Sequence, residues 1–154
     1  MIKKLERLIL QLESKISAHA VMQPAISNAS VGWHIEHALL TIDAITNSLA
    51  KSKPEDYRYQ FDMNRTMVLL LGKIPRGRAR APKVVIPSAD FNETTLHQHV
   101  HLTLKKIKTL DYLTAKHFFK HPFLGDFKLK SAQRFIIVHT QHHLAIINDI
   151  IKSR

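Results

Sequence analysis

Cysteine is absent from this chain of 154 residues. Disulfide bonds, thiolate metal sites and a cysteine nucleophile are therefore excluded, and a reducing cytoplasm is the expected location. Glycine and proline are scarce, with four and six residues, and most of them fall into short clusters. Because these two residues interrupt regular structure, their scarcity predicts long helices joined by short links.

Long apolar runs are lacking as well. The longest uncharged one is MVLLLG, residues 67–72, which is far too short to cross a bilayer. The N-terminal stretch MIKKLERLILQLESKISAHAV carries charges throughout and has neither the apolar region nor the cleavage site of a signal peptide. Hydrophobic residues nevertheless make up 45% of the chain. We therefore expect residues 1–154 to form a single cytoplasmic domain around one core, without a membrane segment.

Acidic residues are outnumbered, since 23 Lys and Arg against 12 Asp and Glu give a net charge of +11 with histidines neutral. Such a charge attracts polyanions without sequence preference. The densest basic run, PRGRARAPK at residues 75–83, lacks interleaved aromatic residues and fits a solvated link better than a nucleic-acid surface. Nucleic acid is thus a disfavoured partner. The alternative function remains a non-enzymatic basic helical module that binds nucleic acid or another polyanion, with histidines that are structural.

Apolar residues recur at spacings of three and four along most of the chain, which predicts helices. The predicted helices are residues 2–18, Ser30 (as the cap) to Lys51, a weaker segment from Pro54 to Gly72, Asn92 or Glu93 to Leu110, and Ser131 (as the cap) to about Lys152. The connections 73–90 and 120–131 contain most of the prolines. We therefore predict an all-α fold, an up-and-down four-helix bundle with an extended basic connection.

The last predicted helix contains three histidines in the apolar stretch RFIIVHTQHHLAIINDII, residues 134–151. At about 100° per residue, His139 and His143 lie at the centre of the inward face and His142 lies at its edge. Residues four apart are stacked neighbours on a helix, so these two imidazoles can converge on one metal ion. The alternative is a pair of hydrogen-bonded core histidines. Burying two imidazoles without partners is costly, which favours metal binding.

A further ligand must come from another helix, and the segment GWHIEH offers His34, Glu36 and His37. Periodicity alone does not choose between the two histidines, because His34 borders the main apolar stripe and His37 lies on the other contacted side. Glu36 fits a ligand, a base or, as the favoured interpretation, a solvated position.

The remaining histidines are weaker candidates. His97, His99 and His101 point in three directions on a helix, which indicates surface groups rather than a shared ion. His121 precedes Pro122 in a turn-like connection, from which it can reach the mouth of a site. Gly-rich phosphate loops and a G-x-S-x-G element are missing from the sequence.

Three segments together resemble the DinB-like (YfiT-like) family of small metalloenzymes, in a branch without an assigned function. They are SVGWHIEHALLTI, HPFLGDF and HTQHHLAIINDI, and their order and spacing cover nearly the whole chain. The resemblance implies a four-helix bundle with a divalent metal held by three histidines. In the family, the first ligand follows the serine that caps its helix by about two turns, which selects His37 over His34. The other two ligands are then His139 and His143.

The sequence also departs from the family pattern. Many members have Arg-Gly-Gln after the histidine pair, where this chain has LAI, and Trp before the capping serine, where it has Ala29. These departures leave the three ligands intact and weaken any borrowed substrate preference.

The resemblance implies either a thiol-dependent transferase or a hydrolase, acting on a small molecule such as a low-molecular-weight thiol. Zn²⁺ or Ni²⁺ suits a site made only of imidazoles. His142, Glu36, His34 or His121 would then transfer protons or support the ligands. A homodimer is compatible with the sequence, since helical bundles often pair along an exposed helix.

Overall fold

The computed structural model describes residues 1–77, 81–88 and 90–153. Its helices are α1 (Ile2–Glu13), α2 (Val31–Lys51), α3 (Met63–Leu71), α4 (Glu93–Ile107) and α5 (Leu129–Lys152), and its strands are β1 (Phe118–His121) and β2 (Gly125–Lys128). Short 3₁₀ turns cover Ile16–Ala18, Pro54–Asp56, Lys83–Val85 and Lys108–Tyr112. The protein is thus mostly helical, as predicted, with a small two-stranded sheet that was not predicted.

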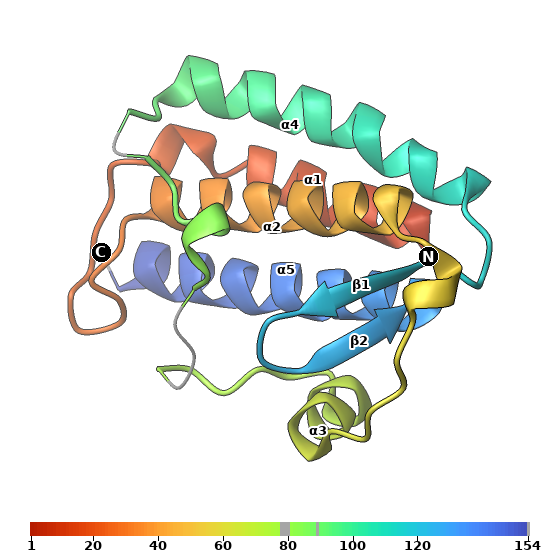
Figure 1. Ribbon diagram of the computed structural model, residues 1–154. Coiled ribbons are helices and arrows are strands. Elements are labelled where there is room, and N and C mark those ends of the chain that lie inside the picture. The colour runs from red at the N-terminus through yellow and green to blue at the C-terminus, as the bar shows by residue number, and fades with distance from the viewer. Residues whose placement is uncertain (78–80, 89, 154) are drawn as a thin grey trace.

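Four helices run side by side, and the hairpin and α3 lie against α5 (Figure 1). Both α1 and α2 contact α4 and α5, so one apolar core forms between the four. Its fully buried members include Ile9, Leu39, Leu96 and Ile147. Burying each such side chain contributes roughly 1.5–3 kcal/mol, which makes α2 and α5 a rigid base for side chains between them.

The predicted ends of two helices are confirmed. The Ser30 hydroxyl accepts a hydrogen bond from the Trp33 amide at 3.2 Å and caps α2. Gly72 ends α3 with φ at +62°, a left-handed conformation that glycine adopts without strain. The predicted first helix is shorter than expected, because α1 ends at Glu13 and only a 3₁₀ turn continues it.

The predicted start of the third helix is wrong. Pro54–Asp56 forms an isolated 3₁₀ turn, and α3 begins at Met63 after the Asp62 side chain, which accepts from the Arg65 amide at 2.6 Å. The Arg65 guanidinium donates to the Leu124 carbonyl at 3.1 Å, so α3 is attached to the hairpin turn. The segment between the 3₁₀ turn and α3 has no regular structure, and Tyr57 and Asp62 at its two ends have extended backbones.

The connection before α5 forms a hairpin, which pairs Phe118 with Lys128 and His121 with Gly125. Gly125 has φ at +71° in the turn, which suits glycine. Phe127 is buried and lies 5.2 Å from the Phe135 ring on α5, measured between centroids. The hairpin therefore closes one side of α5 with an aromatic layer.

The prediction that Ser131 caps the last helix is wrong. The strand β2 runs directly into α5 at Leu129, whose amide donates to the His117 carbonyl at 2.9 Å. This bond gives the Leu129 amide the acceptor that a capping side chain would otherwise supply. The helix therefore starts three residues earlier than a cap at Ser131 indicates.

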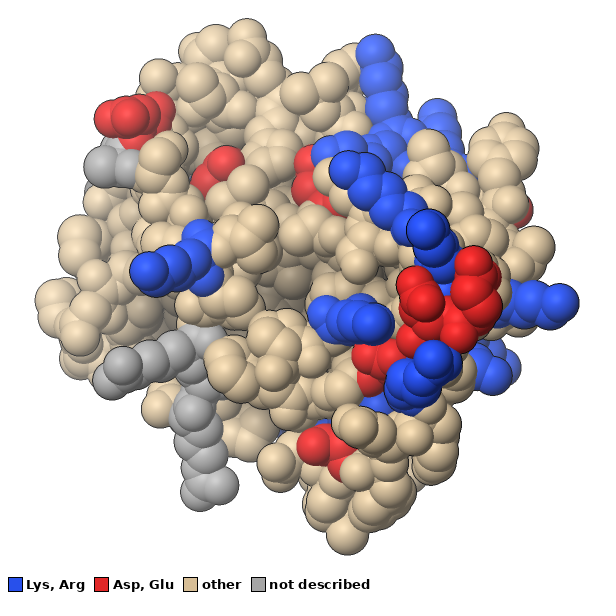
Figure 2. Space-filling view, in the orientation of Figure 1, with Lys and Arg blue, Asp and Glu red and all other residues tan. Residues whose placement is uncertain are grey.

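The basic connection is only partly described, because residues 78–80 and 89, which include two of its arginines, lie outside the described residues. Figure 2 shows Lys and Arg side chains spread over one face, with acidic side chains among them. On this face, acidic side chains interrupt the basic ones.

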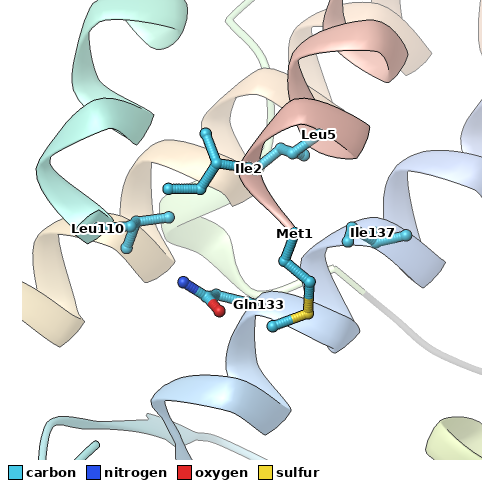
Figure 3. A pocket seen from close by; sticks show the side chains of 6 residues that line it. All are labelled: Met1, Ile2, Leu5, Leu110, Gln133 and Ile137. Carbon is cyan, nitrogen blue, oxygen red and sulfur yellow. The ribbon is translucent and has the colours of Figure 1, made fainter. Parts of the chain in front are cut away.

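A shallow apolar depression lies between α1 and α5. Figure 3 shows the six side chains that line it, of which Gln133 is the polar one. With no titratable side chain, it is a packing feature rather than a candidate site. Among the helices of the described residues, none combines the length and apolar character needed to span a membrane.

Candidate metal centre

Helices α2 and α5 bring three predicted histidines together. His37, His139 and His143 each offer one ring nitrogen, and these atoms all lie within 4.8 Å of one another. The ring centroids of His139 and His143 are 4.5 Å apart, and that of His37 is 4.7 Å from His143. Tetrahedral Zn²⁺ with bonds of 2.0–2.1 Å requires nitrogens roughly 3.4 Å apart, so the 4.8 Å limit puts these three atoms in the range of one shared ion.

The His37 ring has a fixed tautomer. Its Nδ1 lies 2.7 Å from the carbonyl oxygen of Val85, and since a carbonyl only accepts, Nδ1 carries the proton. Its Nε2 therefore holds the lone pair that a metal needs. A backbone carbonyl is a common partner for the second nitrogen of metal-binding histidines. The Trp33 ring stacks on His37 at 4.9 Å between centroids and holds the ring plane.

His139 has a nitrogen without a partner. Its Nδ1 is buried and makes no hydrogen bond within the part of the chain that the structure describes. An unsatisfied buried polar atom costs about 1–3 kcal/mol. The cluster therefore contains a donor atom that core packing alone does not explain.

The three rings are held neutral. Burial lowers the pKa of His37, and the hydrogen bond to Val85 offsets this only in part. Burial and the neighbouring imidazoles lower the pKa of His139 and of His143 well below the ordinary range. Metal binding requires neutral imidazoles, so the cluster is in the binding form at neutral pH.

Two other predicted histidines adjoin the cluster. His34 is buried, and its Nδ1 lies 3.0 Å from Nδ1 of His143. Burial lowers its pKa to about 4, and repulsion between protonated forms of His34 and His37 contributes to the shift. His142 lies at the edge, with its ring 5.1 Å from that of His143. Burial and the Arg76 charge lower the pKa of His142.

His121 stands at the hairpin turn. Its Nδ1 accepts from the amides of Phe123 and Leu124 at 3.1 and 3.2 Å, so the proton lies on Nε2. Burial lowers its pKa to about 4. Its ring meets the edge of Phe135 at 5.2 Å, and Phe135 in turn lies 5.9 Å from His139. His121 is therefore a neutral N–H donor near the cluster, and its Nδ1 is not free to act as a base.

Glu36 points to α4 rather than to the histidine cluster. Its Oε2 lies 2.9 Å from Nδ1 of His99, and Oδ2 of Asp43 lies 3.6 Å from Nε2 of the same ring. The prediction that His99 is a surface group is wrong, because its side chain is only 16% exposed. Burial opposes the charge on His99, but the bonds to Asp43 and Glu36 outweigh it and raise the pKa to about 9. Glu36 and His99 thus form an ion pair between α2 and α4.

This ion pair predicts an alkaline loss of stability. The pKa of His99 is raised from 6.5 to about 9 by folding, so its contribution is complete below pH 6.5 and disappears as the pH rises through 9. The expected decrease in the free energy of unfolding is about 3 kcal/mol. Urea unfolding at several pH values measures it.

Substituting His99→Gln should flatten that alkaline dependence, whereas His101→Gln, on the exposed part of the same helix, should leave it unchanged. An equal alkaline decrease in the His99→Gln variant would assign the effect to other groups.

Two residues of this region gave no signal in the sequence. Val85 contributes only its carbonyl oxygen, which every residue has, and Ser27 lies in a loop seven positions before its partner His34. Neither spacing nor composition distinguishes them.

Comparisons of this chain with family models, with curated proteins and with solved structures find no match.

Proposed function

We propose that this protein is a divalent-metal-dependent enzyme of DinB-like type, a four-helix bundle whose ion is bound by His37, His139 and His143. The observation that carries the proposal is the grouping of three imidazole nitrogens within 4.8 Å. The neutral state of the rings and the unpartnered Nδ1 of His139 support it. The reaction is either hydrolysis or transfer to a thiol.

The donor set fits Zn²⁺ or Ni²⁺, which imidazole suits. Three neutral ligands leave the full charge of the ion and at least one open position, so the bound ion supplies Lewis acidity that activates water or a thiol. The protein contributes the orientation of the ligands. The Val85 carbonyl fixes the tautomer of His37, and the Trp33 ring shields one face of it from water.

Two side chains next to the cluster have separate roles. His121 is a neutral donor through Nε2 and orients a substrate oxygen or sulfur by a hydrogen bond. His142 is half-buried at the edge, where its lowered pKa leaves it neutral at pH 7. One ring nitrogen is hydrogen-bonded to the Ile74 backbone, and we assign the role of base to the other.

Metal content tests the proposal. The protein is purified without a nickel column and analysed by elemental mass spectrometry, beside His139→Ala, His143→Ala and the exposed control His101→Ala. We expect about one ion per chain in the wild type and the control, and loss of the ion in both ligand variants. Trace metal in the wild type, unchanged in the ligand variants, would rule the site out.

A further inference from the structure

His34 is buried in a chain of hydrogen bonds that begins at a candidate ligand. Only 4% of the residue is exposed, and both of its ring nitrogens have a partner. Nδ1 lies 3.0 Å from Nδ1 of His143, and Nε2 lies 3.0 Å from the hydroxyl oxygen of Ser27. That oxygen also accepts from the amide of Ala29 at 3.1 Å, which ties the chain to the loop before α2.

The bond between the two Nδ1 atoms has two arrangements, because either ring can carry its proton. A neutral imidazole has one N–H. If the proton is on Nδ1 of His143, its Nε2 carries the lone pair and can bind an ion. If the proton is on Nδ1 of His34, the proton of His143 is on Nε2, and that atom cannot bind. The direction of this one hydrogen bond therefore decides whether His143 is a ligand through Nε2.

Ser27 can satisfy the arrangement that permits binding. With His34 accepting at Nδ1, its own proton lies on Nε2 and is donated to the Ser27 oxygen. A hydroxyl oxygen has two lone pairs, so it accepts from His34 and from the Ala29 amide together. Both nitrogens of His34 and Nδ1 of His143 then have a partner. They also have one in the reverse arrangement, so it is an ion at Nε2 of His143 that selects between the two.

We propose that His34 is a positioning residue that accepts the Nδ1 proton of His143 and so directs Nε2 of His143 to the ion. This inference rests on the proposed function. In many metalloenzymes a carboxylate takes this place. His34 does the same as a neutral group, so the ion keeps more of its positive charge.

Two variants of similar size separate this role from simple packing. His34→Gln retains an acceptor for His143 and a donor for Ser27, whereas His34→Phe fills the space without hydrogen bonds. We expect His34→Phe to bind Zn²⁺ about 10–100-fold more weakly than the wild type, and His34→Gln to stay within a few-fold of it. Competition with a chromophoric chelator measures the affinities, and circular dichroism confirms that each metal-free variant is folded.

The outcomes distinguish the two proposals. If the wild type binds Zn²⁺ and His34→Phe binds equally well, this inference is wrong and the metal centre stands. If both His34 variants lose binding as completely as His37→Ala or His143→Ala, then His34 is itself a ligand and the positioning role is overturned. If the wild type binds no ion, the proposed function itself fails.

A spectroscopic measurement gives a second readout that packing would not change. In the Zn²⁺-loaded wild type, ¹⁵N spectra of the histidine rings should show His143 protonated at Nδ1 and His34 protonated at Nε2. The reverse assignment would contradict the inference.

Discussion

Acidification of the metal-free protein from pH 7 to pH 4 is expected to unfold it. Folding lowers the pKa of His34 and of His121 from 6.5 to about 4, mainly because burial disfavours the charged rings. The unfolded chain therefore binds protons at higher pH than the folded one. The stability that depends on these neutral rings is complete above pH 6.5 and is lost as the pH falls towards 4.

The size of this effect decides the outcome. A pKa difference of about 2.5 corresponds to roughly 3 kcal/mol for a buried ring such as His34 and to less for His121, which solvent partly screens. The lowered pKa values of His37, His139 and His143 act in the same direction. Typical domains are stable by only about 5–15 kcal/mol. We therefore expect the acid transition at about pH 5. Circular dichroism at 222 nm measures the loss of helix as the pH is lowered.

His121→Asn offers a matched test of the acid transition. An asparagine oxygen can accept the amides of Phe123 and Leu124 as Nδ1 does, but it does not titrate. The transition should move to lower pH in this variant and stay in place in His101→Asn. Stability that remains constant down to pH 4 in the wild type would contradict the account of the buried rings.

Helix geometry made one part of the histidine cluster predictable from the sequence. His139 and His143 are four residues apart on one apolar face, and such a spacing already places two rings side by side. The choice between His34 and His37 was different. Both are buried in the structure, because α2 is contacted on two sides. Periodicity distinguishes buried positions from exposed ones, but it does not distinguish one buried side of a helix from the other.

Other features depend on contacts distant in sequence. The His37 tautomer is set by the carbonyl of Val85, 48 residues away, and the position of His99 by two carboxylates on α2. The hairpin, in contrast, had a local signal. Aromatic residues flank a Pro and a Gly in FFKHPFLGDF, which is typical of paired short strands, but the expectation of helices favoured a simple turn.

Addition of Zn²⁺ to the metal-free protein at pH 7.5 is expected to raise its Tm by about 10 °C. An ion that binds only the folded state stabilises it by about 4 kcal/mol at a thousandfold excess over Kd, and each kcal/mol raises Tm by about 2–4 °C for a chain of this size. The neutral rings of His37, His139 and His143 need not release protons to bind at this pH. Differential scanning fluorimetry measures the shift.

Selectivity and acid sensitivity distinguish this site from general ion binding. Mg²⁺ prefers oxygen ligands, so it should leave Tm unchanged, and His143→Ala should lose the response to Zn²⁺. The response should weaken below about pH 5, because protons then compete for the same ring nitrogens. Zn²⁺ binding at surface histidines would instead persist in His143→Ala, and that result would place the ion elsewhere. A shift confined to the wild type and to His101→Ala would assign it to the cluster between α2 and α5.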